Sequence, residues 1–177
     1  MARIQPINRQ TASAEVNATL DAVQAKLGKV PNLYATVAQA PAVLTAQLAF
    51  GEALSHGRLT AKQRESLALA IGQANSCQYC LSAHSLVARG TGLNAEAIQA
   101  ARRGEAVDPV TDGLLKLAVK IVNQRGILSE ADIAAAYAAG VDNGLLLEVI
   151  AHVALNTLTN YTNHIVQTEI DFPVVTV

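Results

Sequence analysis

The chain has 177 residues, which suits one domain or at most two, and its 15% of charged residues is low for a globular protein. The net charge of −1 excludes the basic surface typical of nucleic-acid-binding proteins, so we expect no nucleic-acid partner. Hydrophobic residues make up 51% of the chain, but aromatic residues make up 3% and tryptophan is absent. The apolar content is mainly aliphatic and rich in alanine, which favours helices over sandwiches and barrels.

Capping residues, prolines and glycines divide the chain into a series of predicted helices. The first four run from Thr11 to Gly28, from Pro31 to about Gln39, from Pro41 to Ser55, and from a capping box at Thr60–Gln63 through the apolar run Leu67–Ile71. The next five run from Ser76 or Cys77 to Gly90, from Asn94 to about Gly104, from Pro109 to Arg125, from Ser129 to Gly140, and from Gly144 to about Thr168 after a cap at Asp142. Apart from the tail Val174–Val177, no segment alternates with the period of a strand. We therefore expect a single all-α domain over residues 1–177, with roughly eight or nine helices.

The apolar stretches are too short to cross a membrane, which requires about 20 apolar residues in a row. The run Leu67–Ile71 is followed by polar and small residues, and Leu145–Leu155 contains Glu148 and His152. The first ten residues lack the apolar centre of a secretion signal. We expect a cytoplasmic protein with no membrane partner. In that reducing compartment a cysteine pair is more often catalytic or metal-binding than structural.

The two cysteines of the chain, Cys77 and Cys80, stand at the predicted start of a helix, and His84 follows one turn later. The spacing places all three side chains on one helix face. The helix start favours a thiolate at Cys77, and a neutral His84 could take the proton of Cys80. Glu65 lies in the preceding helix among apolar residues, and a helical hairpin would bring its carboxylate back to the cysteines as a proton carrier. The pattern indicates a redox-active dithiol.

Two simpler interpretations of the same residues stay open at this point. Cys77, Cys80 and His84 supply three zinc ligands, but a structural zinc site usually has four and the chain has no second cysteine pair. The two thiols could also be incidental members of an alanine-rich core. We favour the redox interpretation and expect neither a bound metal nor a bound cofactor.

The four residues resemble the signature of the AhpD-like alkylhydroperoxidase family, which shares its fold with the carboxymuconolactone decarboxylases. The signature has a Glu twelve residues before the first Cys of Cys-x-x-Cys and a His four residues after the second. Here these are Glu65, Cys77, Cys80 and His84, and the resemblance covers roughly residues 40–125. The best-known peroxidase members carry a second His directly before the second Cys, where this chain has Tyr79.

The resemblance implies an all-helical homo-oligomer, a trimer or an assembly of trimers such as a hexamer, with hydroperoxide reductase activity of the peroxiredoxin type. Cys80 would attack the peroxide and become a sulfenic acid, and Cys77 would resolve it as a disulfide. Glu65 and His84 would relay protons. An external dithiol partner protein, dihydrolipoamide-bearing or thioredoxin-like, would restore the thiols. The alternatives are a decarboxylase-like lyase on the same fold and a non-enzymatic redox sensor.

The last predicted helix carries a polar stripe at four-residue spacing: Glu148, His152, Asn156, Asn160 and His164. Such a stripe on an otherwise apolar helix predicts a hydrogen-bonded network between helices or subunits. The alternative hypothesis is that Tyr79, Asn160 and His164 line the active-site pocket.

Overall fold

The computed structural model describes residues 1–177, which form nine α-helices and no strand. The helices are α1 (Ala14–Leu27), α2 (Asn32–Val37), α3 (Pro41–Ser55), α4 (Ala61–Ala74), α5 (Gln78–Gly90), α6 (Ala95–Arg102), α7 (Pro109–Gln124), α8 (Glu130–Ala138) and α9 (Asn143–Val166). The predicted all-α architecture with eight or nine helices is confirmed. The alternating tail Val174–Val177 forms no strand.

Most helices begin where the sequence offers a side chain that can accept a hydrogen bond from the first turn. These N-caps are Ser13, Thr60, Cys77, Asn94, Asp108, Ser129 and Asp142. Thr60 and Ser129 also form reciprocal capping boxes with Gln63 and Asp132. The prediction for Pro31 needs a correction, because it precedes α2 as the N-cap instead of occupying the first helical position.

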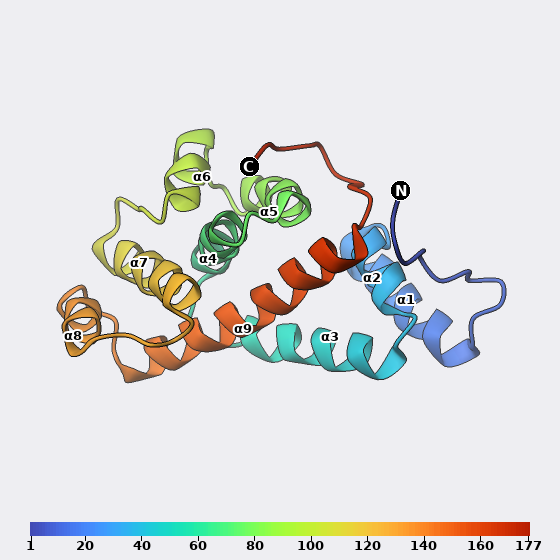
Figure 1. The fold of residues 1–177 in the computed structure, drawn as a ribbon, viewed down its shortest axis with the longest axis horizontal. Helices are drawn as coiled ribbons and strands as arrows, with labels where there is room; N and C mark the ends of the chain where they lie inside the picture. The colour runs from blue at the N-terminus through green and yellow to red at the C-terminus, as the bar shows by residue number, and fades with distance from the viewer.

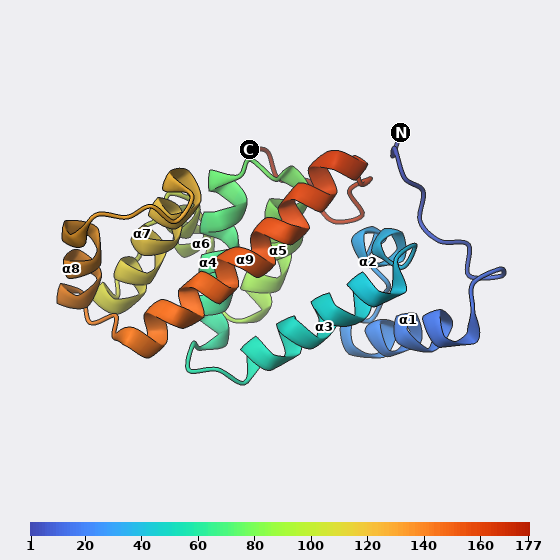
Figure 2. The same cartoon turned by 60° about the horizontal axis from the view of Figure 1, so that its bottom comes forward.

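Helix α4 lies at the centre of the molecule and packs against α5, α6, α7 and α9 (Figures 1 and 2). Seven consecutive residues of α4, Ser66–Gly72, are buried, which is expected of a helix covered on several sides. Helix α9 crosses the molecule from α8 to α2, so it contacts both the α4–α7 group and the α2–α3 group (Figures 1 and 2). The central hairpin and this crossing helix position the functional residues described below.

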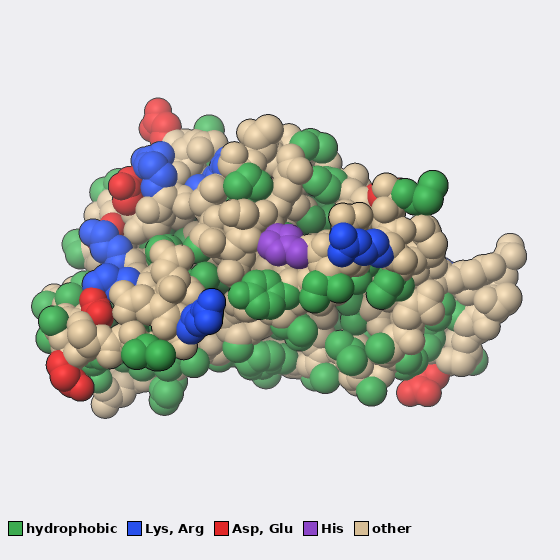
Figure 3. Space-filling view, viewed as in Figure 1, with side chains coloured by type: hydrophobic (Ala, Val, Ile, Leu, Met, Phe, Trp, Pro, Cys, Tyr) green, Lys and Arg blue, Asp and Glu red, His purple; other side chains and the backbone are tan.

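The surface divides into a charged end and an apolar edge. Lys, Arg, Asp and Glu side chains gather at the end formed by α6–α8, and apolar side chains gather along the edge where α3 and α9 run (Figure 3). Exposed apolar residues of that edge include Val43 and Phe50 on α3 and Leu147, Ile150 and Leu158 on α9. None of the helices could cross a membrane alone; α8 and α9 meet the length and hydropathy criteria only together, as a pair bent by 114°.

Candidate active site

A tight reversal between α4 and α5 brings the predicted site residues together. Ser76 adopts the left-handed conformation, with φ of 55°, which is uncommon for a residue other than glycine. The N–H of Cys77 then donates to the carbonyl of Gly72 at 2.8 Å, and α5 returns along α4. The hairpin expected from the sequence is formed, and it places Glu65 of α4 beside His84 of α5.

The Cys80 thiol lies in a buried, hydrogen-bonding environment built from two parts of the chain, the start of α5 and the helix α9. Cys77 caps α5, and its Sγ accepts a hydrogen bond from the Cys80 N–H at 3.4 Å. Two side-chain amides of α9 donate to Cys80 Sγ, Asn160 Nδ2 at 2.9 Å and Asn163 Nδ2 at 3.3 Å. Both cysteines are free thiols. Donors aimed at sulfur favour its negatively charged form.

Asn75, the last residue before Ser76, orients one of these amides. Its Nδ2 donates to Asn160 Oδ1 at 2.9 Å, which turns the Asn160 NH₂ group towards Cys80. Asn163 Oδ1 is buried and has no hydrogen-bond partner. A buried acceptor without a hydrogen bond lowers the free energy of unfolding. The orientation of Asn163 that lets its Nδ2 donate to Cys80 therefore reduces the stability of the protein.

The two cysteines have opposite acidities. The hydrogen bond from Cys77 lowers the pKa of Cys80 to about 6, against the effect of burial, and the charge of His84 and the amides of Asn163 and Asn160 act in the same direction. The hydrogen bond to Cys80, burial and the Cys80 charge all raise the pKa of Cys77. This differs from the expectation that the helix start favours a thiolate at Cys77. The physical reason is that two neighbouring thiolates repel each other, so only one thiol ionises readily. Cys80 is that thiol because the side-chain amides of Asn160 and Asn163 donate hydrogen bonds to it.

The Glu65–His84 pair supplies a charge partner for the thiolate. His84 Nδ1 lies 2.8 Å from Glu65 Oε2, and both side chains are partly buried. Burial opposes the imidazolium, but the charge and hydrogen bond of Glu65 and the charge of Cys80 outweigh it and raise the pKa of His84. The site therefore favours a Cys80 thiolate beside a His84 imidazolium, in place of the neutral His84 that the sequence suggested.

Tyr79, between the two cysteines, makes structural contacts through its hydroxyl group. The hydroxyl accepts from the Leu33 N–H at 3.1 Å and donates to Asp171 Oδ1 at 2.8 Å. Burial raises the pKa of Tyr79, and the nearby Asp171 and Cys80 charges act in the same direction. The phenol is therefore neutral at physiological pH and cannot serve as a base.

Two cavities meet at the Glu65–His84 pair. The first has a volume of about 410 Å³ and is mainly apolar, with Cys80 and Tyr79 in its wall. The second has a volume of about 340 Å³ and is more polar, with His152 and Arg64 in its wall and no cysteine. Glu65 and His84 line both. The first cavity can accommodate an apolar molecule next to Cys80. The second gives water or polar groups access to Glu65 and His84.

The polar stripe of α9 is only partly at the site. His152, Asn156 and Asn160 are buried, whereas His164 is exposed and stacks on Tyr161 with ring centroids 6.4 Å apart. His164 lines neither cavity at the Glu65–His84 pair. Asn163, which the sequence interpretation did not include, takes the place next to Cys80.

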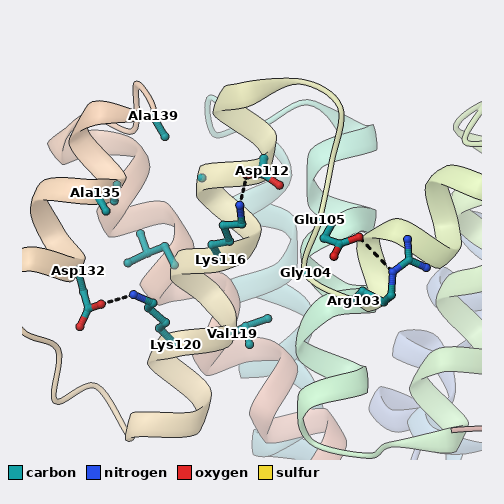
Figure 4. Close-up of a pocket in the computed structure, with 13 residues that line it drawn as sticks. Arg103, Gly104, Glu105, Asp112, Lys116, Val119, Lys120, Asp132, Ala135 and Ala139 are labelled. Carbon is teal, nitrogen blue, oxygen red and sulfur yellow. Dashed lines mark hydrogen bonds and ion pairs between the residues drawn. The ribbon is translucent and has the colours of Figure 1, made fainter.

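The largest cavity of the molecule lies elsewhere, among α6, α7 and α8, with a volume of about 570 Å³. Its charges are paired with one another, Arg103 with Glu105, Lys116 with Asp112 and Lys120 with Asp132 (Figure 4). No group of three or more His, Cys, Asp or Glu side chains is arranged to hold a metal ion.

The segment that carries this site is similar to a known protein family. Residues 41–109, which include Glu65, Cys77, Cys80 and His84, match the model of the carboxymuconolactone decarboxylase family. No curated protein matches the chain. This match agrees with the resemblance found in the sequence, and the fold is AhpD-like.

Solved structures share the fold over nearly the whole chain. An uncharacterised peroxidase-related protein with an alkylhydroperoxidase AhpD core, from Ralstonia eutropha JMP134, is 24% identical, with a TM-score of 0.86 over 96% of this chain and 92% of its own. A peroxidase-related protein from Silicibacter sp. TM1040 is 21% identical, with a TM-score of 0.81 over 94% and 92%. A cysteine-to-alanine variant of the debrominase Bmp8, in complex with 2,3,4-tribromopyrrole, is 18% identical, with a TM-score of 0.80 over 96% and 91%.

Proposed function

We propose that the protein is a thiol-dependent hydroperoxide reductase in which Cys80 is the peroxidatic residue. The observation that carries the proposal is the environment of Cys80, a buried sulfur with a pKa of about 6 that receives hydrogen bonds from two amides. A thiolate is the nucleophile in peroxide reduction, and this one is formed at neutral pH. The cavity beside it admits a substrate.

The reaction follows in three steps. The Cys80 thiolate attacks one peroxide oxygen, the O–O bond breaks, and the leaving alkoxide takes a proton from the His84 imidazolium, which gives an alcohol and Cys80 sulfenic acid. Cys77, which is still protonated, then attacks the sulfenic sulfur, and water leaves as the disulfide forms. An external dithiol reduces this disulfide, and Glu65 holds His84 in place for the next proton transfer.

The two cysteines have distinct expected phenotypes. Cys80→Ser is expected to abolish peroxide consumption, whereas Cys77→Ser is expected to consume one equivalent and stop as a sulfenic acid that dimedone traps. Stopped-flow kinetics with cumene hydroperoxide and mass spectrometry measure both. Peroxide consumption by Cys80→Ser at the wild-type rate would overturn the assignment. A reaction that survives loss of both thiols would indicate an acid–base lyase, and a single slow oxidation without turnover would indicate a redox sensor.

A second candidate is reductive debromination of a small aromatic compound, as the similarity to the debrominase Bmp8 suggests. The favouring observation is the apolar cavity with Tyr79 and Phe172 in its wall, next to two thiols that together supply two electrons. A carbon–bromine bond would be replaced by a carbon–hydrogen bond, with release of bromide and formation of the disulfide. Bromide release from 2,3,4-tribromopyrrole in the presence of dithiothreitol would separate this activity from peroxide reduction.

The proposal includes assembly with copies of the same chain. The exposed apolar residues of α3 and α9 form an edge without a covering element in the monomer. A second copy of the chain is the occupant that the resemblance implies, and the trimer or hexamer expected from it would bury this edge.

A further inference from the structure

The segment after α9 returns over α5 and is fixed there by hydrogen bonds. It covers residues 167–177 and runs past the C-terminal end of α9 towards α5 and α6 (Figure 1). The Val175 N–H donates to Ser82 Oγ at 3.0 Å, and Arg102 Nη2 donates to the Thr176 carbonyl at 2.7 Å. The C-terminal segment is thus held against α5, the helix that carries Cys80, by specific hydrogen bonds.

Asp171 is the central anchor of this segment. Its carboxylate accepts from the Tyr79 hydroxyl at 2.8 Å and from the Asn32 N–H at 3.3 Å, and it forms an ion pair with Lys29 Nζ at 2.9 Å. Its side chain is 22% exposed, so these contacts are partly shielded from water. Tyr79 therefore connects the first turn of α5, which carries Cys80, to the C-terminal segment.

Phe172 follows Asp171 and lies in the wall of the 410 Å³ cavity together with Cys80 and His84. Its ring meets the Tyr79 ring edge-on, with centroids 5.6 Å apart and an interplanar angle of 89°. Lys29 Nζ lies 3.9 Å from the centre of the same ring. Contacts with Tyr79 and Lys29 thus fix the orientation of an aromatic ring in the cavity that contains the reactive sulfur.

We propose that Phe172 is a specificity-determining residue of the Cys80 site and that it selects hydroperoxides with an aromatic or similarly flat apolar substituent. Tyr79 and Asp171 act as positioning residues that hold this wall. The inference rests on the proposed peroxidase function. It adds that the C-terminal segment, through Phe172, contacts the organic group of the substrate. Tyr79 and Asp171 do not contact the reacting oxygen atoms in this scheme.

The chemistry of the cavity supports this selection. Its wall is mainly apolar, and its polar side chains are those of the Cys80–His84–Glu65 site together with Lys29, Tyr34, Tyr79 and Thr159. A flat apolar group placed against Phe172 exchanges water for ring contact, which lowers the free energy of binding. Hydrogen peroxide has no such group and gains nothing from the ring. Because the ring is already fixed by its neighbours, little conformational entropy is lost when a substrate binds.

The test compares two substrates and two phenylalanines. The chain has two Phe residues, and Phe50 on α3 lines neither cavity, so Phe50→Ala is a matched control for Phe172→Ala provided that sedimentation velocity shows the same assembly as the wild type. Phe172→Ala is expected to lower the ratio of kcat/KM for cumene hydroperoxide to that for hydrogen peroxide about tenfold, mainly through KM, as for loss of an apolar pocket contact. Phe50→Ala is expected to leave the ratio unchanged. An unchanged ratio in Phe172→Ala would overturn the proposal.

A second pair of variants tests the positioning role. Tyr79→Phe keeps the ring but removes the hydroxyl contacts with Leu33 and Asp171, and Asp171→Asn keeps the size of the side chain but removes its charge. Both are expected to lower the same substrate ratio by several-fold, with a KM effect larger than the kcat effect. Equal losses for the two peroxides would indicate a merely structural role and contradict the proposal.

Binding of the product alcohol separates failure of this inference from failure of the proposed function. The alcohol formed from cumene hydroperoxide, 2-phenyl-2-propanol, needs no redox chemistry, and ligand-observed NMR measures its Kd. Phe172→Ala is expected to raise this Kd about tenfold, with Phe50→Ala as the control. If the wild type reduces no peroxide but binds the alcohol through Phe172, the proposed peroxidase function is wrong, but the proposed role of Phe172 in binding flat apolar groups is supported. If Phe172→Ala binds the alcohol as tightly as the wild type, the proposed role of Phe172 in substrate selection is wrong, whichever reaction the protein catalyses.

Discussion

The side-chain amide of Asn160 donates a hydrogen bond to Cys80 Sγ at 2.9 Å, although the two residues are 80 positions apart in sequence. The contact joins the crossing helix α9 to the first turn of α5. Together with Asn163 it supplies donors that stabilise a thiolate inside the protein. The acidity of the proposed nucleophile thus depends on how α9 packs.

Replacement of this amide is expected to make Cys80 less acidic. Asn160→Leu keeps the approximate size of the side chain but removes the donor, and a hydrogen bond to a charged group contributes about 1.5–3 kcal/mol, so the pKa of Cys80 should rise by roughly one to two units. The pH dependence of alkylation by iodoacetamide, followed by mass spectrometry, measures this shift. The matched control is Asn156→Leu, because Asn156 is buried on the same helix and donates to the His152 carbonyl. A similar shift in both variants would exclude a specific role for Asn160.

The wild-type protein should show its thiolate at an unusually low pH. Because the pKa of Cys80 is about 6, lowered from 9.0, the alkylation rate should be nearly constant above pH 7 and fall about tenfold for each unit below pH 6. The sign follows from the ionisation, since protonation below the pKa removes the reactive form. The Cys77→Ala variant, which has no side-chain donor at this position, should lose most of this low pKa, because the Cys77 hydrogen bond is its largest cause. A midpoint near pH 9 in the wild type would contradict the assignment of Cys80.

Loss of the Glu65 charge is expected to weaken proton transfer. Glu65→Gln keeps a hydrogen-bonding side chain but removes the negative charge that raises the pKa of His84, so less imidazolium is present at neutral pH. Peroxide reduction at pH 7 should fall roughly 100-fold, which is within the range for loss of a general acid. Steady-state kinetics against pH should show the alkaline limb, where the His84 imidazolium loses its proton, shifted to lower pH. Glu96→Gln, on the exposed first turn of α6, is the control and should leave the rate unchanged.

Two glycines should respond in opposite ways to alanine. A Cβ at Gly113 of α7 would lie 2.6 Å from Ala139 Cβ, so Gly113→Ala should lower the free energy of unfolding by about 1–3 kcal/mol through overpacking between α7 and α8. A Cβ at Gly90, the last residue of α5, meets nothing within 4 Å, so Gly90→Ala should be neutral or stabilising by up to about 1 kcal/mol. Urea unfolding followed by circular dichroism compares them. Equal stability of the two variants would contradict this account of α7–α8 packing.

A charge placed on the apolar edge should disrupt the proposed assembly. Ile150→Glu on α9 introduces a carboxylate at a position that is 44% exposed in the monomer, so the fold should tolerate it while an interface would not. Sedimentation velocity should then show a shift from oligomer to monomer. Ile127→Glu, between α7 and α8 and 81% exposed, lies outside this edge and serves as the control. A monomeric wild type would exclude the assembly.

Local signals in the sequence were sufficient for most of the fold. Thr60, Asn94, Ser129 and Asp142 cap helices as predicted, since an N-cap depends on the few residues around it, whereas the first helix begins after Ser13 and not at the expected Thr11. The Glu65–His84 contact also follows from local pattern, because adjacent helices joined by a short turn pack against each other. Only the conformation of that turn, with Ser76 in the left-handed region, had no sequence signal.

The rest of the site depends on contacts between distant segments. A four-residue step on a helix rotates by about 40° past a full turn, so a stripe built from such steps leaves the buried face after a few of them. Asn160 is still buried, but the next step leads to the exposed His164, and the three-residue step leads to the buried Asn163. Asp171 and Phe172 lie in a segment without periodicity, and their contacts with Tyr79 could not be predicted from spacing.

The left-handed turn at Ser76 and the docking of α9 have a consequence for the order of events during synthesis. A chain that has not yet docked residues 160–163 lacks both amide donors to Cys80, and its thiol keeps a pKa nearer to the ordinary value for cysteine. The docking of α9 therefore completes the hydrogen bonding of the Cys80 sulfur, whereas the contribution of Cys77, which is the largest cause of the low pKa, depends only on the start of α5.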